Sequence, residues 1–341
     1  MSTQNSTPVL SVRDLSVSFS FGDQPVAVVD NISLELGPGE ILGLVGESGC
    51  GKSMTGAALM VLVPHPAGQV SAGRMQLEET NLARLSEADW RRVRGRLVSM
   101  VFQEPLTALD PVFTIGNQLI EVIRRHQRIK GAKAVNAAIT QLGSVGFSDV
   151  ENLMKAFPHE LSGGMRQRVV LAMAMCSKPR VLIADEPTTA LDVTTQAQIL
   201  QEIQKLAKQA GTGVVLITHD LGVAAQVCDR IQVMYCGRIV EQGSPAQLFS
   251  QALHPYTAGL LASMPQVSKG PVQPVRTIPG TVPHPSLVPP GCRFSNRCTH
   301  ADSECHSVMP QLTEAIDSTV TPGTSQDRHL HACIHPLAGS R

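Results

Sequence analysis

A glycine-rich stretch of eight residues constrains the fold of this chain more than any other feature. Residues 46–53 read Gly-Glu-Ser-Gly-Cys-Gly-Lys-Ser, which fits the G-x-x-x-x-G-K-[ST] pattern of a phosphate-binding loop. The apolar run 41–45 before the loop predicts a buried strand, and the run 54–62 after it predicts a helix. Such a strand, loop and helix present backbone N–H groups and a helix N-terminus to an anion. The sequence therefore predicts an α/β fold that binds a nucleoside triphosphate.

The residue types of the loop explain how it would bind phosphate. Glycine adopts backbone conformations closed to other residues, so successive N–H groups can converge on phosphate oxygens. Lys52 can reach the β- and γ-phosphates, and the Ser53 hydroxyl can ligate Mg²⁺. We expect the ATP-binding residues of this loop to be Gly46, Glu47, Ser48, Gly49, Cys50, Gly51, Lys52 and Ser53.

Further polar side chains follow apolar runs that also predict strands. Asp185 and Glu186 come directly after the run 181–184, and His219 follows the run 214–217. Open α/β sheets bind their ligands at the carboxyl ends of the strands. We therefore expect Asp185 to hold Mg²⁺ and Glu186 to polarise the attacking water. His219 can donate a hydrogen bond to the γ-phosphate and orient that water.

Composition narrows the classes of partner. The net charge is zero and the pI is near 7.2, so the chain lacks the basic footprint of a nucleic-acid-binding protein. Aromatic residues make up 3% of the chain, too few for platforms on which single strands stack. No apolar run approaches the roughly 20 residues that span a bilayer, and no signal peptide precedes the first strand-like segment. We expect a soluble, cytosolic protein with no nucleic-acid partner.

Periodicity divides the chain into regions. Alternating apolar and polar residues before the loop predict an antiparallel β-layer. Residues 86–178 are mostly helical in pattern, with helices expected over 115–128, 132–142 and 162–177. From residue 181 strands alternate with helices, which predicts a parallel sheet, and residues 233–241 predict a late hairpin. We expect a nucleotide-binding domain over 1–251 and, over 252–341, an extended Pro-rich appendage with little helix and no large core.

Several motifs together resemble those of the ATP-binding-cassette (ABC) ATPases. The string LSGGMRQ at 161–167 resembles the family's signature sequence, and 181–186 resembles its Walker B strand. Residues 190–192 match the D-loop, His219 the switch histidine and Gln103 the Q-loop glutamine. The resemblance implies an ABC cassette. Its core is a RecA-like parallel sheet, joined by an N-terminal antiparallel β-layer and by a helical subdomain at about 86–178.

The same resemblance implies a role for each matching residue. Ser162 and the two amides after it begin a predicted helix, a second anion-binding terminus that faces the ATP of a partner subunit in this family. The implied catalytic residues are Glu186, His219 and Gln103. The implied Mg²⁺ ligands are Ser53, Gln103 and Asp185. Further implied ATP-binding residues are Ser162, Gly163, Gly164, Gln167 and Asp192.

Many members of the family stack the adenine base on an aromatic residue upstream of the loop. Phe19 and Phe21 are the candidates, and they alternate with serines in a strand-like pattern that also suits a core position. We expect Phe21 to stack on the base because Gly22 follows it.

The C-terminal region narrows the resemblance further. The string HPYT at 254–257, the string CRFSNRC at 292–298 and two later cysteines resemble the tail of oligopeptide/dipeptide importer ATPases, in particular dipeptide permease ATPase subunits. This implies an ATPase subunit at the cytoplasmic face of the membrane that powers import of di- or oligopeptides. The implied partners are an identical or homologous ATPase subunit, two transmembrane permease subunits and an extracytoplasmic solute-binding protein. Nickel, glutathione or another small solute is the alternative cargo, and a soluble non-transport ABC ATPase is the competing class.

Eight cysteines fall into two groups. Four lie in the loop or in apolar stretches and are expected to be buried thiols, namely Cys50, Cys176, Cys228 and Cys236. The other four have several interpretations. Disulfides are disfavoured in the cytosol. A zinc site could use His331 or His335, which alternate with Cys333 and would share one face of a strand. A zinc site usually uses a close C-x₂₋₄-C pair, and the gaps here are longer. Spacing alone does not select a cluster either, and inert thiols are the remaining alternative. The family resemblance favours a [4Fe–4S] cluster on Cys292, Cys298, Cys305 and Cys333.

Overall fold

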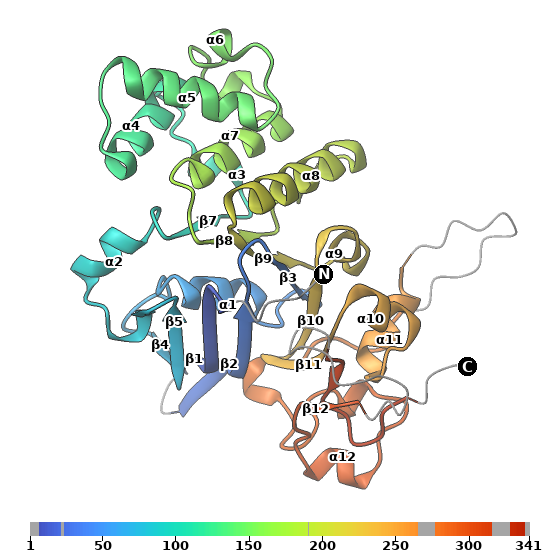
Figure 1. The fold of residues 1–341 in the computed structure, drawn as a ribbon. Coiled ribbons are helices and arrows are strands. Elements are labelled where there is room, and N and C mark those ends of the chain that lie inside the picture. The colour runs from blue at the N-terminus through green and yellow to red at the C-terminus, as the bar shows by residue number, and fades with distance from the viewer. Residues whose placement is uncertain (1–6, 22–23, 190, 265–276, 316–327, 338–341) are drawn as a thin grey trace, which may run out of the picture.

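The computed structural model describes residues 7–21, 24–189, 191–264, 277–315 and 328–337. A large sheet forms the centre of the molecule, with a smaller β-layer beside it, a helical part above it and the C-terminal extension below it (Figure 1). Within the described residues, no helix combines the length and the apolar character that crossing a membrane requires.

The central sheet has the parallel strands that the sequence predicts. Its order within the described residues is β12-β13-β11-β10-β3-β9-β8-β7. The parallel strands are β10 (Arg230–Tyr235), β3 (Ile41–Val45), β9 (Gly213–Thr218), β8 (Val181–Asp185) and β7 (Val98–Val101). The expected hairpin is confirmed, since β11 (Arg238–Gly243) pairs antiparallel with β10. Two short strands of the extension, β12 (Thr313–Glu314) and β13 (Leu330–His331), add to the β11 edge.

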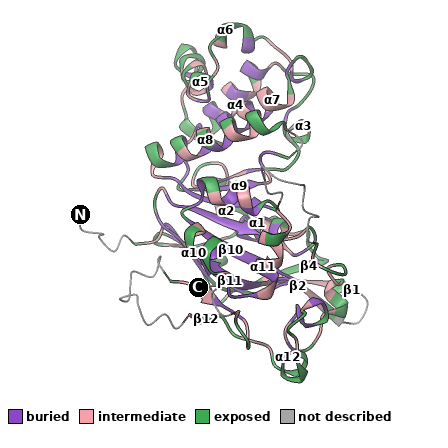
Figure 2. Ribbon diagram, turned by 90° about the vertical axis from the view of Figure 1, so that its right-hand side faces the viewer, coloured by how far each residue is buried: buried purple, intermediate pink, exposed green. Residues whose placement is uncertain are grey.

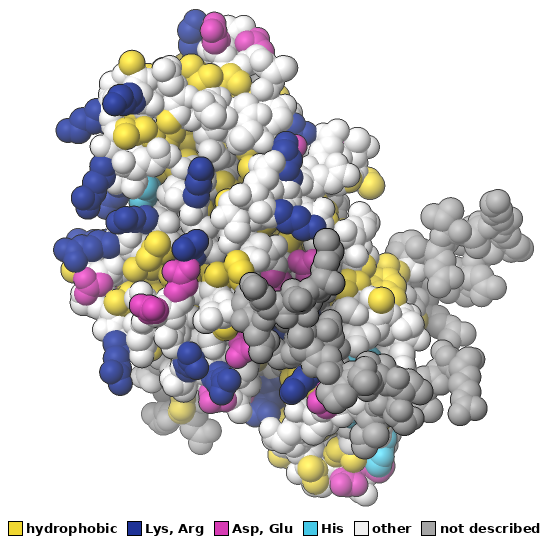
Figure 3. All heavy atoms as spheres, viewed as in Figure 1, with side chains coloured by type: hydrophobic (Ala, Val, Ile, Leu, Met, Phe, Trp, Pro, Cys, Tyr) yellow, Lys and Arg dark blue, Asp and Glu magenta, His cyan; other side chains and the backbone are white. Residues whose placement is uncertain are grey.

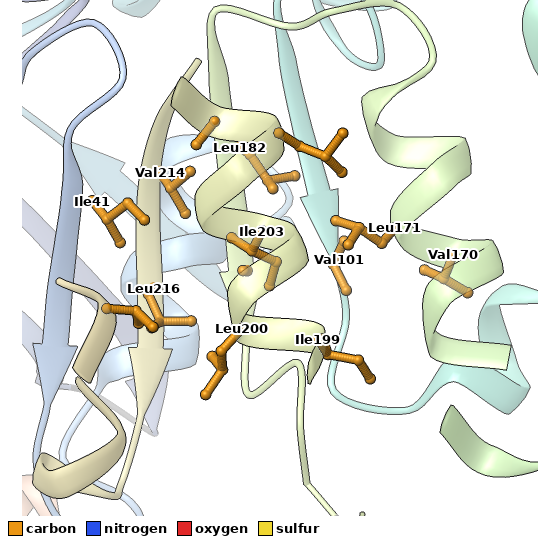
Figure 4. Close-up of a cluster of buried hydrophobic side chains, with 14 of the residues drawn as sticks. Ile41, Val101, Val170, Leu171, Leu182, Ile199, Leu200, Ile203, Val214 and Leu216 are labelled. Carbon is orange, nitrogen blue, oxygen red and sulfur yellow. The ribbon is translucent and has the colours of Figure 1, made fainter. Parts of the chain in front are cut away.

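Hydrophobic side chains cover both faces of this sheet. Because successive strand residues point to opposite faces, β3 sends Ile41 into one core and Leu42 into the other. On the first face Leu182, Val214 and Leu216 meet helix α8 (Val193–Ala210), whose inward side chains stand over the strands (Figure 4). Burial on both faces is why these strands are continuous apolar runs in the sequence.

The β-layer covers the second face together with helix α1 (Lys52–Leu59). It is antiparallel, as predicted, and has the order β2-β1-β5-β6, with β4 also paired to β1. The strands are β1 (Leu10–Phe21), β2 (Gln24–Leu36), β4 (Gly68–Ser71), β5 (Arg74–Leu77) and β6 (Thr80–Asn81).

The helical part lies above the first face and turns its buried residues inward (Figure 2). In α4 the side chains of Ile115, Leu119 and Ile123 recur every four residues and are all fully buried, the pattern of an amphipathic helix. The three helices expected in this region are present as α4, α5 and α7, with ends that differ by at most two residues from the expected ones. The elements of this part are α3 (Pro105–Ala108), α4 (Ile115–Gln127), α5 (Ala132–Ser144), α6 (Val150–Leu153) and α7 (Gly163–Met175). Helix α2 (Glu87–Val93) instead buries Trp90 and Val93 in the second-face core.

The C-terminal extension has little helix, as expected, but it shares the core of the cassette. Tyr256 and Phe294 are buried in the first-face core. Arg293 binds Asp30 of β2 and the Cys236 carbonyl oxygen at the β10–β11 turn. The appendage is therefore docked on the sheet rather than extended away from it. Its helices include α11 (Pro255–Ala262) and α12 (Ser303–Ser307), and α9 (Leu221–Val227) and α10 (Pro245–Ser250) precede it.

A buried carboxylate anchors this docking. Glu241 of β11 is fully buried and accepts hydrogen bonds from the N–H groups of Leu253 (2.8 Å) and His254 (2.9 Å) and from His329 Nε2 (2.8 Å). Burial alone would raise the pKa of Glu241, but these hydrogen bonds, led by that of His329, outweigh burial and lower it. The ionised side chain therefore joins the sheet to the start of α11 and to the chain leading into β13.

We expect Glu241→Gln to lower the free energy of unfolding by about 2–3 kcal/mol, because an amide cannot accept all three of these hydrogen bonds. Denaturant unfolding would measure it. Glu314→Gln is the control: Glu314 is exposed and forms an ion pair with Arg328 (3.9 Å), so its substitution should cost less than about 0.5 kcal/mol. The pKa of Glu241 is lower in the folded protein, so its contribution is present above the unfolded-state pKa and is lost in acid. A gap between wild type and Glu241→Gln that widens on acidification would contradict this account.

Candidate active site

The phosphate loop connects β3 to α1 and wraps around Lys52. The Lys52 Nζ donates to the carbonyl oxygens of Gly46 (2.7 Å) and Glu47 (3.0 Å). A Cβ on Gly46 would lie 2.2 Å from the Met234 carbonyl oxygen, and Gly51 has φ +106°. Both positions therefore require glycine. The loop can present its N–H groups and one ammonium to a phosphate chain.

Ser53 and Asp185 meet beside the loop. The Ser53 hydroxyl donates to Asp185 Oδ1 (3.0 Å), although the two residues are far apart in sequence. Burial raises the pKa of Asp185, while the Ser53 hydrogen bond and the Lys52 charge counter part of that rise. A hydroxyl and a carboxylate are hard oxygen donors of the kind that Mg²⁺ prefers. These two side chains fit one corner of a Mg²⁺ site.

Two of the predicted residues, Gln103 and His219, and also Thr189 lie around the Glu186 carboxylate. Its Oε2 accepts from Gln103 Nε2 (3.1 Å) and from Thr189 Oγ1 (2.8 Å), and its Oε1 lies 3.1 Å from His219 Nδ1. Glu186 has a left-handed backbone with φ +45°, an uncommon conformation for a residue with a Cβ. Such strain concentrates at functional sites, and here it accompanies a turn of the chain directly after β8.

The surroundings keep Glu186 ionised. Burial alone would raise the pKa of Glu186, but hydrogen bonds from Thr189 and His219, with the charges of His219 and Lys52, outweigh burial and lower it. A carboxylate that is ionised at neutral pH can accept a proton from water or hold a water by hydrogen bonding. The arrangement can therefore bind a triphosphate and activate a water beside it.

The signature residues lie apart from this group. Ser162 caps α7, where its Oγ accepts from the N–H of Met165 (3.3 Å), and α7 lies in the helical part, away from α1 (Figure 1). Gln167 is buried in α7. Asp192 caps α8 by accepting from the N–H of Thr195 (2.9 Å). Among the described contacts, no hydrogen bond or ion pair joins residues 162–167 or Asp192 to the phosphate loop.

The structure describes the adenine candidates unequally. Phe19 is partly buried and packs against the second-face core, which is the core role that its alternation with serine allowed. Phe21 is the last residue of β1, but its side chain lies outside the described part, as do Gly22 and the D-loop residue Ala190. The expectation for Phe21 therefore stays a prediction.

The four tail cysteines come together. Cys292, Cys298, Cys305 and Cys333 all line one small cavity, and His335 also borders it. Burial raises the pKa of Cys333 to about 12, so its thiol stays protonated unless a cation replaces the proton. The donor set therefore fits a thiolate-bound metal. The other four cysteines are buried free thiols, as expected.

The predicted strand that would align His331, Cys333 and His335 is wrong, because β13 ends at His331. His331 pairs in register with Glu241 and Thr313 instead. Among the described residues, the one group of possible ligands close enough for a single ion is Asp302, Cys305 and His335, whose ligand atoms lie within 4.8 Å of one another.

Three contacts to functional residues do not follow from the sequence motifs. Thr189 holds Glu186, while Tyr256 and Arg297 of the extension both hold Glu47 of the phosphate loop. Tyr256 and Arg297 stand within the tail strings that carry the family resemblance. That position was the available signal, but nothing in the strings indicates a link to the loop.

Comparisons with known proteins agree along most of the chain. Residues 29–189 match the family described as "ABC transporter", and residues 240–305 match "Oligopeptide/dipeptide transporter, C-terminal region". The chain is 46% identical over 304 residues to the oligopeptide transport ATP-binding protein AppD of Bacillus subtilis, covering 89% of this chain and 92% of the relative. It is 44% identical over 327 residues to the dipeptide transport ATP-binding protein DppD of the same organism, covering 96% and 97%.

Solved structures share the fold. The dimeric structure of the ATP-binding cassette MJ0796 in a post-hydrolysis state bound to ADP and Pi has a TM-score of 0.61 and 25% identity, covering 69% of this chain and 98% of that chain. The structure of cbiO1 from Clostridium perfringens has a TM-score of 0.61 and 23% identity, covering 71% and 91%. The predicted fold class is therefore confirmed.

We expect Glu186→Gln to retain ATP binding, because the shape is kept, and to slow ATP turnover by at least about 10²-fold, because an amide cannot accept the proton. Single-turnover hydrolysis and nucleotide affinity would separate the two effects. Glu151→Gln, on the exposed surface of α6, is the control and should leave both unchanged. Wild-type turnover in Glu186→Gln would exclude Glu186 as the main base.

Proposed function

Because the chain belongs to the family of ATP-binding proteins of oligopeptide and dipeptide ABC transporters, we propose that it is the ATP-hydrolysing subunit of an importer for di- and oligopeptides. Membership in this family implies ATP hydrolysis coupled to transport. The observation that carries the peptide assignment is the match of residues 240–305 to the oligopeptide/dipeptide C-terminal region. The chain also has the catalytic side chains described above, around Lys52 and Glu186.

The proposed chemistry follows from the contacts around the loop. Lys52 and the loop N–H groups would bind phosphate oxygens, and Ser53 and Asp185 would hold the Mg²⁺, with Gln103 as a further oxygen donor. Bound Mg²⁺ supplies charge stabilisation for the phosphates. Glu186 would take the proton of the attacking water. Gln103 and His219, which already contact the Glu186 carboxylate, would fix the direction of that water.

The signature supports a two-subunit site. Ser162 and the N–H groups of Gly163 and Gly164 begin α7, so they form an anion-binding terminus. Ser162 and Gly164 border an open cavity of about 530 Å³ that Arg168 and Thr195 also line. Since no described hydrogen bond or ion pair joins these residues to their own phosphate loop, they would face the ATP of a second ATPase subunit, identical or homologous. Gln167 and Asp192 would support that interface.

A surface beside Gln103 suits a permease. Phe102, Val112 and Phe113 are 46%, 70% and 52% exposed, and Phe102 lines a groove of about 600 Å³ between the sheet and the helical part. In Figure 3 hydrophobic side chains lie among Lys and Arg residues over the helical part. Exposed apolar side chains next to a catalytic loop would transmit ATP-driven closure to a bound partner. The proposed partners are two transmembrane permease subunits, at the cytoplasmic face of the membrane, and an extracytoplasmic solute-binding protein.

Transport measurements test this assignment. The protein would be purified with its membrane partners through a tag on this chain, reconstituted in vesicles with the solute-binding protein, and supplied with di- and oligopeptides. We expect peptides to stimulate ATP hydrolysis and to be imported, and Glu186→Gln to abolish both without loss of assembly. Stimulation by Ni²⁺ or glutathione alone would replace the cargo assignment. Failure to recover any membrane subunit would favour a soluble, non-transport ABC ATPase.

We also propose that the tail cysteines bind a [4Fe–4S] cluster, with zinc as the alternative. Cys292, Cys298, Cys305 and Cys333 line one cavity, and four thiolates are the ligands of such a cluster. Metal ligation would add folding free energy to a segment that has little regular secondary structure. The group of Asp302, Cys305 and His335 supports the zinc alternative, although Asp302 already accepts from the N–H of Cys305 (3.0 Å) and from His335 (2.8 Å).

Anaerobically purified protein is expected to be brown, with broad absorbance near about 400 nm and about four irons per chain. Cys298→Ser should lose the iron, whereas Cys176→Ser, at the end of α7, should keep it. Stoichiometric zinc without iron would support the Asp/Cys/His site. Metal-free protein with reactive thiols would contradict both assignments.

A further inference from the structure

The extension reaches the phosphate loop at its second residue. The N–H of Glu47 donates to the hydroxyl oxygen of Tyr256 (2.8 Å), and Tyr256 is fully buried at the start of α11. A buried tyrosine keeps its hydroxyl in one place because ring packing fixes both of its side-chain torsions. The beginning of the loop is therefore fixed by a residue 209 positions further along the chain.

Arg297 binds the same residue through its side chain. Its Nη1 donates to Glu47 Oε2 (2.7 Å) and its Nη2 donates to Glu47 Oε1 (3.1 Å). The Arg297 side chain is 5% exposed and that of Glu47 is 30% exposed. Two parallel charge-assisted hydrogen bonds give direction as well as strength. Glu47 is thus held at both its backbone and its carboxylate by the extension.

Contacts other than the one with Glu47 also hold the Arg297 side chain in place. Its Nε donates to the Pro279 carbonyl oxygen (2.8 Å), and its guanidinium lies 5.7 Å from the Tyr235 ring and 5.9 Å from the Phe294 ring. Phe294 in turn packs on Tyr256 at 5.4 Å. Three aromatic rings therefore join the end of β10, the start of α11 and the segment that carries Arg297.

The segment that carries Arg297 contacts both the cysteine-lined cavity and the phosphate loop. Residues 294–298 send Phe294, Ser295 and Cys298 toward the cavity of the four cysteines, while Arg297 points at the loop. Arg297 directly precedes Cys298. A change in the spacing of the thiols would move the backbone from which the guanidinium extends.

From these contacts we propose that Arg297 is a positioning residue for nucleotide binding, which fixes the phosphate loop through Glu47 and couples the cysteine-lined cavity to it. The proposal rests on the assignment of residues 46–53 as the ATP site. On this proposal the affinity of the site for ATP depends on the C-terminal extension, and this dependence acts through Arg297.

The test measures the dissociation constant for ATP on the purified full-length protein, together with KM and kcat in the assembled transporter. Arg297→Gln is expected to raise the dissociation constant and KM by about tenfold, the loss of one bidentate charged contact, and to change kcat by less. Arg297→Lys should restore only part of the affinity, because an ammonium lacks the planar fork. Lys52→Ala separates the two proposals: if it leaves ATP binding intact, the ATP site itself is misassigned.

Arg293 provides a matched control. It lies in the same segment and is as deeply buried, but its partners are Asp30 and the Cys236 carbonyl oxygen rather than the loop. Arg293→Gln should weaken docking of the extension, seen as a lower melting temperature, and leave the ATP dissociation constant within about twofold. Equal losses of affinity in the two arginine variants would overturn the proposal.

Glu47→Gln tests the ion pair by changing its more exposed member, Glu47. This substitution leaves the packing of the extension around Arg297 unchanged. It should weaken ATP binding about as much as Arg297→Gln, and the double variant should be no weaker than either single one. Additive effects, or an unchanged affinity in Glu47→Gln, would overturn the proposal.

Thiol alkylation or metal removal should change the ATP affinity of the wild type and not that of Arg297→Gln. An equal change in both would show that Arg297 does not carry the coupling.

Discussion

The parallel pairing of β7, β8, β9, β3 and β10 is the constraint on which the rest of the structure depends. Parallel strands end at the same edge of a sheet, so residues that leave different strands meet there without sequence proximity. The phosphate loop leaves β3, Asp185 and Glu186 leave β8, His219 leaves β9 and Gln103 leaves β7. The hydrogen bonds from Gln103 and His219 to Glu186, and from Ser53 to Asp185, follow from that single arrangement.

Burial on both faces makes this edge rigid. Each strand alternates side chains between two hydrophobic cores, so a shift in register by one residue would send every side chain of the strand to the opposite face. The first-face core also contains Tyr256 and Phe294, and β13 extends the sheet beyond β11. The extension is therefore part of the structure that positions the loop, and charged contacts at Glu241, Arg293 and Arg297 attach it to the cassette.

The sequence predicted the parts of the site that local patterns encode. The loop, the carboxylates after β8 and the cap at Ser162 each combine a short motif with an apolar run, so their place on strands and helices could be inferred. The length of β13 could not, because His331, Cys333 and His335 alternate in sequence, whereas pairing with β11 and β12 ends at His331. The contact between Arg297 and Glu47 joins residues 250 positions apart, and only the packing of the tail on β10 and α11 brings them together.

This division has a functional consequence. Residues that touch phosphate, metal or water are specified by motifs of a few residues, and similar motifs can be carried by many cassettes. The residues that hold the phosphate loop from behind belong to a segment outside the part of the chain that matches the ABC transporter family, residues 29–189. A cassette that needs only the sheet edge for chemistry can thus acquire control of nucleotide affinity from an added segment, provided that one side chain reaches the loop. In this chain Arg297 reaches the loop, and under the coupling proposed above the cysteines beside Arg297 would give that control a chemical input.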